Sequence, residues 1–575
     1  MPYNISKTKI DCSYPLTNWH GDKQCFINDI LKSLVENRTA HGNVNFDSPV
    51  LKDIPDPTLL KDCAAAAELL VKFIQNKQKI VIYGDYDVDG ISSAALLARF
   101  FEIIGFTNFA VMIPDRFTHG YGINEASRDD VLKLMPECLI TVDNGSKIFA
   151  EEDFYINKKI TLIITDHHQP DSQSAPSKSL FVNPKQSGCS YPDKDIAGVG
   201  VVYLLLIQLR RVLRDLGWWD SKDLAVPNLV NFLDLVTLGT IADQAPVIGL
   251  NRIFVYHGLK RINLWWQKEP QKQPFYLTRL QKHLQADTLT GEGIAFQIAP
   301  LINAAGRISH GKLAFDFLMS TNLDDSKIRF NHLAKLNQQR KVRQKDMLKS
   351  ALESIKNDAL NSPAIVYDDS FHEGLIGIIA GNLSQQLGVP AVVLSSAKND
   401  QLKASCRSPA QVNLLTILNK LQHHFERFGG HSQAAAFQMK EEKLAIFKSD
   451  FCKLYEELVS EQNITSTITP LADLELFPWM ATRELYDALE VLAPFGMQNL
   501  RPSFLFKGIS LKSPSYTNNI LTKWRLNRQT DLIIFGDYLP EFDAGLWDIM
   551  GSLLLKKNGR YTYLQIIINA LAPAN

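Results

Sequence analysis

Cysteine is scarce in this sequence, and no two cysteines are spaced as a redox or zinc motif. Seven cysteines are scattered over 575 residues without a Cys-x-x-Cys pair. The odd number and the wide spacing argue against a disulfide framework and against a structural zinc site. We therefore expect a protein of a reducing compartment.

Long apolar runs are also lacking. The longest, such as 199–207, are much shorter than the roughly 20 residues that a helix needs to cross a bilayer. The first residues, MPYNISKTKIDCSYPL, lack the apolar core of a signal peptide. These absences predict a cytoplasmic protein that does not associate with a membrane.

An excess of charge of either sign is absent as well. The chain has 61 Lys and Arg residues and 61 Asp and Glu residues, so its formal net charge is zero. Without a global positive field, any binding of nucleic acid must come from local basic patches. The sequence also contains no internal repeat and no low-complexity tract.

The chain is long enough to hold several domains, because a single core rarely extends beyond about 250–300 residues. Changes of pattern along the sequence suggest where the domains begin and end. The expected segments are a helical lead-in (1–75), an α/β domain (76–322), a connecting helix (323–360), a smaller α/β domain (361–465) and a β-barrel, with an OB-fold as the favoured type (466–575).

Short apolar strands alternate with helices from about residue 79, which predicts a parallel sheet covered on both faces. We expect strands at 79–84, 108–113, 138–142, 160–165 and 179–182, then helices at 196–216, 227–243 and 248–263, and a polar insertion followed by a helix within 265–290.

The second half of the chain begins with a helical pattern at 323–358 that contains neither Pro nor Gly. A new α/β unit follows, and then β-branched runs separated by turn signals. The expected elements are a strand at 364–367, a helix at 375–387, a strand at 390–394, and barrel strands at 504–509, 523–526, 532–535, 547–554 and 561–568.

Three aspartates, Asp85, Asp87 and Asp89, alternate directly after the first buried strand, and Gly90 closes the run. Like charges at a strand end repel one another, and their burial without a partner is costly. A bound divalent cation makes the arrangement favourable. The plain alternative is a solvated acidic turn.

Three further segments carry the same type of residue. Asp143 follows the third expected strand, the triplet 166–168 (Asp-His-His) follows the fourth, and Asp243 ends an apolar helical run. Because parallel strands end at one edge of a sheet, these side chains can converge with the first three aspartates. Carboxylates suit Mg²⁺, and an added imidazole shifts the preference toward Mn²⁺. Each aspartate taken alone could instead cap a helix.

The motifs resemble, in this order, those of the DHH phosphoesterase superfamily: Asp-Tyr-Asp-Val-Asp-Gly (85–90), Val-Asp-Asn-Gly (142–145), Asp-His-His (166–168) and Leu-Gly-Thr-Ile-Ala-Asp (238–243). Residues 428–435 (FGGHSQAA) resemble the GGH motif of the DHHA1 partner domain. More closely, nearly the whole chain is similar to the bacterial single-stranded-DNA-specific exonucleases of this superfamily. The resemblance implies a DHH domain, a connecting helix, a DHHA1 domain and an OB-fold.

The resemblance also implies 5′→3′ degradation of single-stranded DNA with Mn²⁺ or Mg²⁺, in DNA recombination and repair. The number of carboxylates makes two ions plausible. The metal ligands that it implies are Asp85, Asp87, Asp89, Asp143, His167 and Asp243. The catalytic residues that it implies are His168, Asp166, Arg307 and His431, and the substrate-binding residues are Arg116, Ser405, Arg407, Gly429 and Gly430.

Two features of the second α/β domain depart from the family pattern. Gly381-Asn382 stands where the family usually has Ser-Arg, and Ala436 replaces a glycine. We place Ser405 and Arg407 in a short polar loop suited to phosphate capture. In the barrel, Tyr516, Trp524, Arg525 and Arg528 are candidates for holding the strand, with Trp524 alternatively in the barrel core.

Three other functions compete with this one. They are a DHH phosphodiesterase or phosphatase acting on short oligonucleotides or nucleotides, a non-catalytic replication scaffold, and an α/β protein without metal. The terminal barrel counts against the first, and the retained carboxylates count against the second. Besides single-stranded DNA, we expect a helicase and a single-strand-binding protein as partners, and a monomeric chain.

Overall fold

The computed structural model describes residues 4–5, 11–13, 23–41, 46, 48–170, 176–355, 362–397, 400–462, 470–512, 514–517, 521–535, 545–558 and 561–574. They form two compact units. The parallel-sheet unit contains Asn37–Gln338 and Glu490–Arg501, and the second unit contains Met1–Glu36, Gln339–Leu489 and Pro502–Asn575.

A five-stranded parallel sheet lies at the centre of the parallel-sheet unit. Its order is β4-β3-β5-β6-β7. The bounds are β3 Ile80–Gly84, β4 Phe109–Met112, β5 Cys138–Val142, β6 Thr161–Thr165 and β7 Leu180–Val182. Every residue of β3 and β5 is buried, as expected for central strands with apolar side chains on both faces. The predicted parallel sheet is therefore confirmed.

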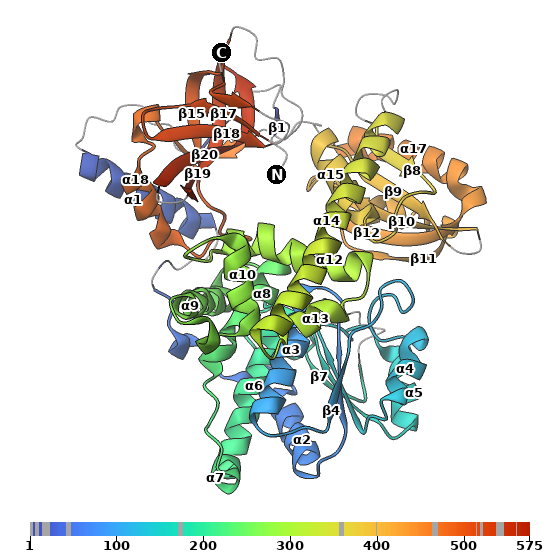
Figure 1. Cartoon of the computed structure of the whole chain (residues 1–575). Helices are drawn as coiled ribbons and strands as arrows, with labels where there is room; N and C mark the ends of the chain where they lie inside the picture. The colour runs from blue at the N-terminus through green and yellow to red at the C-terminus, as the bar shows by residue number, and fades with distance from the viewer. Residues whose placement is uncertain are drawn as a thin grey trace. The chain divides into compact units, whose positions relative to one another are not determined.

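Helices cover both faces of this sheet (Figure 1). On one face, Ile80 and Ile82 pack into a large core with α2 (Cys63–Gln75), α3 (Val88–Ile103) and α6 (Gly198–Asp215). On the other face, Val81 and Tyr83 pack with α4 (Arg128–Lys133) and α5 (Phe149–Asn157). The alternation of side chains along β3 divides the two cores.

The rest of the parallel-sheet unit is helical. The elements are α7 Trp218–Lys222, α8 Leu233–Ala242, α9 Gly249–Trp266, α10 Phe275–Leu284, α11 Gly291–Gly293, a π-helix at Ile294–Ile298, α12 Ala299–Ile308 and α13 Lys312–Leu318. Helix α9 is longer than predicted because Trp265 and Trp266 are buried in the core, so the polar insertion begins after them. No helix in the described part of the chain is both long and apolar enough to span a membrane.

Helix α14, Leu323–Ser354, contains the boundary between the two units, which falls after Gln338. This is the predicted connecting helix. Its predicted last residues, 356–358, lie outside the described residues, as do the predicted domain boundaries at 360/361 and 465/466.

Residues 364–462 of the second unit form a mixed sheet with helices. The strand order is β11-β12-β10-β9-β8, with β8 and β9 parallel and the other pairs antiparallel. The bounds are β8 Ala364–Tyr367, α15 Ile376–Leu387, β9 Ala391–Ser396, β10 Gln401–Arg407, α16 Leu414–Leu418, β11 Phe425–Gly430, β12 Ala434–Lys440 and α17 Leu444–Gln462.

Seven strands of the C-terminal residues follow the path β14-β15-β19-β20-β18-β17-β16, and β1 from the N-terminal residues is the eighth strand of this sheet. Helix α18 precedes β15, and α1 lies near the N-terminus. The bounds are α1 Lys23–His41, β13 Leu471–Ala472, β14 Leu474–Glu475, α18 Arg483–Leu489, β15 Ser503–Ser510, β16 Tyr516–Thr517, β17 Leu521–Arg525, β18 Thr530–Phe535, β19 Leu546–Asn558 and β20 Tyr561–Pro573.

The N-terminal lead-in differs from the expected helical segment. Besides α1 and α2, it contains the short strands β1 (Asn4–Ile5) and β2 (Asp11–Cys12). Strand β1 pairs with β20, and β2 pairs with β13, both in parallel. Two-residue strands carry too few residues for a periodic pattern, so no local signal in the sequence indicates them.

Candidate metal centre

The first three aspartates lie where β3 leads into α3. Asp85 follows the strand directly, and its Oδ1 accepts a hydrogen bond of 2.7 Å from the Tyr86 amide. Asp87 is the N-cap of α3 and accepts a hydrogen bond from the Gly90 amide. Asp89, in the first turn of α3, is 1% exposed. Helix capping therefore accounts for Asp87 but not for Asp85 or Asp89.

The carboxylate of Asp89 is held by a second helix. The amide of Gly198 donates to its Oδ2 at 2.7 Å, and the amide of Val199 donates to its Oδ1 at 2.9 Å. These are the first two amides of α6, which have no partner within the helix. The N-terminus of α6 thus fixes Asp89 and favours its negative charge.

Asp143 comes directly after β5 in a left-handed conformation, with φ of 62°. Its Oδ1 lies 3.2 Å from Nε2 of His167, yet both atoms are buried without a hydrogen bond from any described residue. Gly198 leaves room for this carboxylate, because a Cβ at that position would lie 2.6 Å from Asp143 Oδ1.

Asp166 organises the histidines, and its carboxylate also lies within 4.8 Å of ligand atoms of Asp143, His167 and His168. Its oxygens accept hydrogen bonds from the amides of Ser146 and His167 and from Nδ1 of His168. Burial opposes the charge on Asp166, but the bond from His168 prevails and lowers the pKa of Asp166. Burial likewise opposes the charge on His168, while Asp166 raises the pKa of His168 to about 9. Each member of this pair therefore favours the charged form of the other.

Asp243 is the C-cap residue of α8 and completes the cluster. Nε2 of His167 lies 3.8 Å from Asp243 Oδ2 and 3.9 Å from Asp89 Oδ2. Helix α8 approaches Asp89 closely at Gly239, where a Cβ would lie 2.6 Å from Asp89 Oδ1.

The buried carboxylates of this cluster repel one another when they are ionised, and burial and this repulsion raise their pKa values. Burial, reinforced by Asp87, raises the pKa of Asp89 to about 7. Burial, reinforced by Asp89, raises the pKa of Asp243 to about 8. The pKa of Asp143 is raised by the same two effects, burial and neighbouring carboxylates. A cation among them would remove this penalty.

The donor set fits two divalent cations. Asp89, His167 and Asp243 offer ligand atoms within 4.8 Å of one another, and so do Asp85, Asp87 and Asp143. In the first group, Nε2 of His167 is buried and has no hydrogen-bond partner among the described residues. The same holds for Oδ1 of Asp143 in the second group. Oxygen ligands with one imidazole suit Mn²⁺ and Mg²⁺. The structure thus brings all six predicted metal ligands together in one unit.

Two predicted arginines lie beside the aspartate loop. The guanidinium of Arg116 lies 5.2 Å from the ring centroid of Tyr86. Helix α12 contacts the same loop, because Asn303 accepts a hydrogen bond from the Val88 amide. Burial raises the pKa of Tyr86 to about 12, against the nearby positive charges of Arg116 and Arg307.

The remaining predicted residues belong to the second unit. The prediction of a polar loop for Ser405 and Arg407 was wrong, because both lie on strand β10 and pair with Ala436 and Ala434 of β12. The run 401–407 alternates buried and partly exposed residues over its first half, which suits a strand better than a loop. Arg407 donates a hydrogen bond to Ser405 Oγ at 3.2 Å.

The glycine-rich motif of the second unit lies on the strand next to β12. Gly429 and Gly430 end β11, and the amide of His431 donates to the Ala434 carbonyl in the following turn. The departures from the family pattern lie close by: Ala436 pairs with Gly429, and a Cβ at Gly381 would lie 3.9 Å from Arg407 Cγ.

The barrel candidates divide into buried and exposed residues. Trp524 is 3% exposed, and its indole NH donates to the Leu511 carbonyl, so it belongs to the barrel core. Arg525 forms an ion pair with Asp531. Tyr516 is 53% exposed and remains a candidate for stacking. Arg528 lies in the turn between β17 and β18.

Three polar residues that support the histidines were not predicted from the sequence. Tyr121 OH lies 3.3 Å from His168 Nδ1. Asn183 donates to the His168 carbonyl and to Ser146 Oγ. Asn183 follows β7 as Asp143 follows β5, so its position at a strand end was an available signal. Ser146 follows the Val-Asp-Asn-Gly motif directly.

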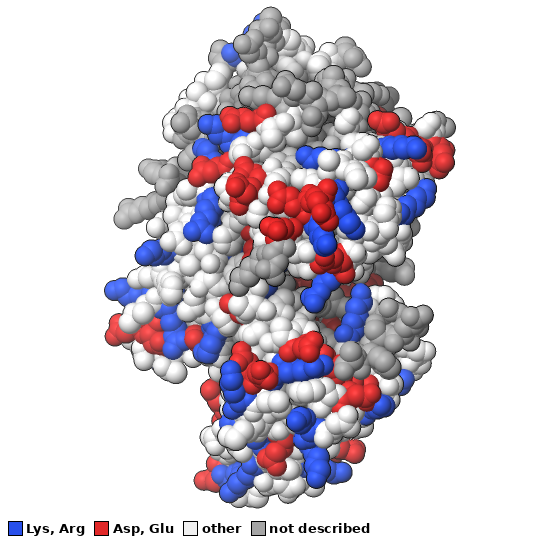
Figure 2. Space-filling model, turned by 90° about the vertical axis from the view of Figure 1, so that its right-hand side faces the viewer, with Lys and Arg blue, Asp and Glu red and all other residues white. Residues whose placement is uncertain are grey.

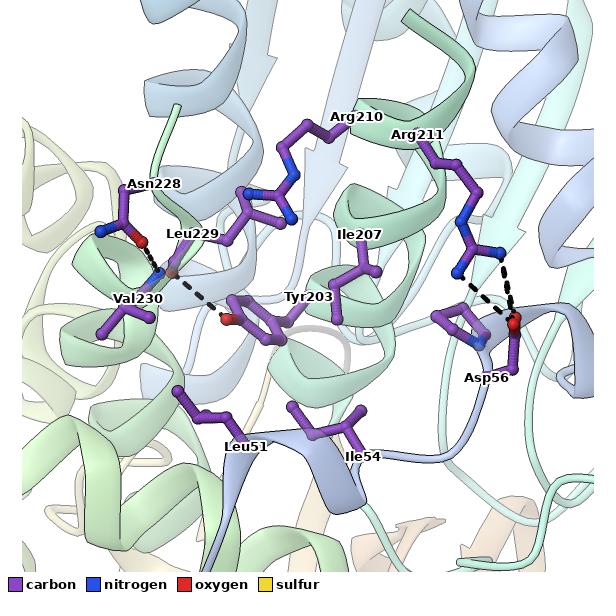
Figure 3. Close-up of a pocket in the computed structure, with 11 residues that line it drawn as sticks. Leu51, Ile54, Asp56, Tyr203, Ile207, Arg210, Arg211, Asn228, Leu229 and Val230 are labelled. Atoms are coloured by element: carbon purple, nitrogen blue, oxygen red, sulfur yellow. Dashed lines mark hydrogen bonds and ion pairs between the residues drawn. The ribbon is translucent and has the colours of Figure 1, made fainter. Parts of the chain in front are cut away.

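A cavity of about 400 Å³ lies elsewhere, along α6 (Figure 3). Its polar groups are already engaged: Arg211 pairs with Asp56, Tyr203 donates to the Leu229 carbonyl, and Arg210 donates to the Pro227 carbonyl. The residues that line it include none of the predicted site residues. The chemistry therefore belongs to the carboxylate cluster.

Comparison with known proteins assigns all three regions. Residues 79–240 match the DHH family N-terminal domain, residues 361–460 match the DHHA1 domain, and residues 472–570 match the RecJ OB domain. The single-stranded-DNA-specific exonuclease RecJ of Escherichia coli is 30% identical over 449 residues, which cover 76% of each chain.

Two crystal structures are similar as well. RecJ from Thermus thermophilus in complex with Mn²⁺ has a TM-score of 0.76 at 23% identity, covering 97% of this chain and 79% of that chain. An exonuclease RecJ bound to manganese has a TM-score of 0.58 at 29% identity, covering 69% of this chain and 95% of that chain. The expected DHH, DHHA1 and OB architecture is confirmed, and the chain belongs to the RecJ family.

Proposed function

We propose that this chain is a metal-dependent exonuclease that hydrolyses single-stranded DNA in the 5′→3′ direction, in DNA recombination and repair. The observation that carries the proposal is the cluster of five carboxylates and His167, in which Asp143 Oδ1 and His167 Nε2 are buried and receive no hydrogen bond from the described residues. RecJ relatives named for this activity, and a manganese-bound RecJ at 29% identity, support it.

The six clustered residues Asp85, Asp87, Asp89, Asp143, His167 and Asp243 would hold two Mn²⁺ or Mg²⁺ ions. Bound there, the ions supply Lewis acidity and lower the pKa of a water that can attack the phosphodiester. The protein contributes a rigid frame for this. Asp89 is fixed by the amides of α6, and Asp87 by the first turn of α3.

The remaining residues bind and orient the DNA. Asp166 accepts a hydrogen bond from Nδ1 of His168, which favours the charged form of this ring and leaves its Nε2 for a phosphate oxygen. Arg307 and Arg116, next to the aspartate loop, would neutralise phosphate charge as the transition state forms.

The second unit would supply the 5′→3′ polarity. Arg407 and Ser405 are hydrogen-bonded to each other on β10 and would bind the 5′-terminal phosphate. His431, after Gly429 and Gly430, would contact the substrate phosphate. Local contacts of this kind are required, because basic and acidic side chains are interspersed on the face shown in Figure 2 and the net charge is zero.

The test is digestion of 5′-labelled and 3′-labelled single strands and of duplex with Mn²⁺, with Mg²⁺ or with chelator. We expect degradation of single strands from the 5′ end with either metal and none with chelator. Equal activity on duplex, or release of the 3′ label first, would contradict the proposal.

A substitution ties this activity to the cluster. Asp143→Ala should lower cleavage by at least about 10³-fold, since bound metal is worth several kcal/mol in the transition state. Asp153→Ala is the matched control, because Asp153 is an exposed carboxylate of the same unit that pairs only with Lys178 among the described residues. Retained nuclease activity in purified Asp143→Ala protein would contradict the metal site.

The competing function, a phosphodiesterase of short oligonucleotides, makes no use of the C-terminal barrel. Competition between a long single strand and a dinucleotide separates the two, because the exonuclease should prefer the long strand. A preference for the dinucleotide would favour the alternative.

The expected helicase and single-strand-binding partners, the monomeric state and the cytoplasmic location extend this proposal. A helicase would supply unpaired strands, and a single-strand-binding protein would keep them extended. Pull-down with purified helicase and single-strand-binding protein tests the partners, and light scattering of the purified chain tests the monomer.

A further inference from the structure

Residues Glu490–Arg501, which we call the linking segment, belong to the parallel-sheet unit although they come from the far end of the chain. They connect α18 with β15, and both of these elements belong to the second unit. The linking segment therefore leaves one unit, packs within the other and returns. A simple connection between α18 and β15 would need no such excursion.

Buried polar contacts anchor the linking segment. Arg252 of α9 is 4% exposed and donates hydrogen bonds to the carbonyls of Leu492 and Ala493. Asn499 is 1% exposed and donates to the carbonyls of Leu492 and Pro494. A buried cation that lost its acceptors would be strongly destabilising, so Arg252 holds the segment in place.

Ion pairs hold the end of the linking segment in place. Arg501 forms ion pairs of 2.7 Å with Glu292 of α11 and with Glu490 at the start of the segment. Its guanidinium also lies 4.2 Å from the ring centroid of Phe495. Both ends of the segment are thus fixed on the parallel-sheet unit.

The middle of the linking segment contacts the turn that carries Asp243. The amide of Val247 donates to the Met497 carbonyl at 2.8 Å. Gly496 faces the same turn, because a Cβ there would lie 2.4 Å from Val247 Cγ2 and 3.4 Å from Ile241 Cδ1. Residues on both sides of Asp243 therefore touch the segment.

Asp243 needs such support more than the other carboxylates. Its side chain is 26% exposed, against 1% for Asp89 and 2% for Asp143. Among the described residues, no amide or side chain donates a hydrogen bond to its carboxylate, whereas Asp89 has two such donors. Its place 3.8 Å from His167 Nε2 is therefore set by the backbone of the turn.

We propose that the linking segment positions Asp243 for metal binding, with Gly496 and Met497 as its positioning residues. The inference rests on the proposed function, since it assigns a support to one ligand of the proposed metal centre. It makes the C-terminal half of the chain part of that centre without any contact to the metal.

The test is a set of variants of the full-length chain, read by Mn²⁺ binding without DNA, through the electron paramagnetic resonance signal of free Mn²⁺. Gly496→Ala should push Val247 and weaken Mn²⁺ binding by about 10- to 100-fold, as when a ligand's support is lost. Val247→Ala removes the Cγ2 atom that the new methyl group meets, so the double variant should recover most of the affinity.

A double-mutant cycle with Asp243→Asn separates positioning from general damage. If the linking segment acts through Asp243, then Gly496→Ala should cause no further loss of Mn²⁺ affinity in the Asp243→Asn background. A full additive loss there, or wild-type Mn²⁺ affinity in a folded Gly496→Ala protein, would overturn the inference. Thermal unfolding of each variant shows that it is folded at the temperature of measurement.

If the Gly496→Ala protein does not fold, the same double-mutant cycle can be measured with Arg501→Gln. This substitution removes the ion pairs of Arg501 with Glu292 and Glu490. A non-additive loss with Asp243→Asn again supports the inference, and an additive loss again overturns it. Failure of the proposed function is a different result: the wild-type protein would then bind Mn²⁺ and respond to these variants, yet degrade no DNA.

Discussion

The absence of a side chain at Gly198 lets α6 reach the carboxylate cluster. Its amide donates to Asp89, while its α-carbon faces Asp143, so a single residue serves two aspartates. Gly200 lies two residues further along the same helix. A Cβ added there would have the ring of Phe254 as its nearest neighbour, at 3.4 Å. The two positions provide a matched pair.

Gly198→Ala should therefore weaken Mn²⁺ binding, because the new methyl group would meet Asp143 Oδ1 at 2.6 Å. Overpacking of this kind also costs about 1–3 kcal/mol of unfolding free energy. Isothermal titration with Mn²⁺ and thermal unfolding measure the two effects.

Gly200→Ala is the control for that experiment. We expect unchanged Mn²⁺ affinity and equal or greater stability, because alanine is favoured over glycine within a helix by roughly 0.5–1 kcal/mol. Equal Mn²⁺ affinities for Gly198→Ala and Gly200→Ala would show that α6 does not set the position of Asp143.

Strand β17 shows why aromatic residues of a barrel cannot be assigned by type alone. Trp524 points into the core, while its neighbours Lys523 and Arg525 are more exposed and pair with Asp531. Tyr516, on the adjacent strand β16, is exposed. An aromatic side chain thus packs in the core at Trp524 and is available for binding at Tyr516.

Trp524→Ala should destabilise the C-terminal sheet by about 3–5 kcal/mol, the usual cost of removing a buried aromatic side chain. Tyr516→Ala should change stability by less than about 0.5 kcal/mol, as is usual at the surface. If Tyr516 stacks on a base, the same variant should weaken binding of oligothymidine by about 1–3 kcal/mol. Denaturant unfolding and fluorescence anisotropy measure the two quantities, and unchanged anisotropy would assign Tyr516 no role in binding.

The parallel sheet and most of the carboxylate cluster could be predicted because their signals lie close in sequence to a buried strand, whereas Asp243 ends helix α8. Asp85 and Asp143 follow buried strands of five residues, and the edge of a parallel sheet gathers such positions. The strand position of Ser405 was missed because β10 carries polar residues, so its alternation is weak. The pairing of β1 with β20 depends on contacts between distant parts of the chain, which no local pattern encodes.

The clustered carboxylates of the candidate metal centre all belong to the parallel-sheet unit, one of the two compact units of the molecule. A ligand that binds only the folded state stabilises it by mass action, by about 2.7 kcal/mol at 100 times its dissociation constant. Removal of metal should therefore lower the melting temperature of the parallel-sheet unit and leave that of the second unit unchanged.

Scanning calorimetry with saturating Mn²⁺ and with chelator measures this difference. The shift should vanish in Asp143→Ala and persist in Asp153→Ala. A shift of equal size in both transitions would mean that the two units unfold together.

The linking segment also has a consequence for the biosynthesis of the chain. Arg252 and the Leu492 carbonyl that it binds are 240 residues apart, so one is made long before the other. At about 5–20 residues per second, roughly 12–50 s pass between them on the ribosome. During that time the turn of Asp243 lacks the support of the segment, and Arg252 lacks these acceptors. We therefore expect an incomplete chain to be a poor nuclease until the segment has been made.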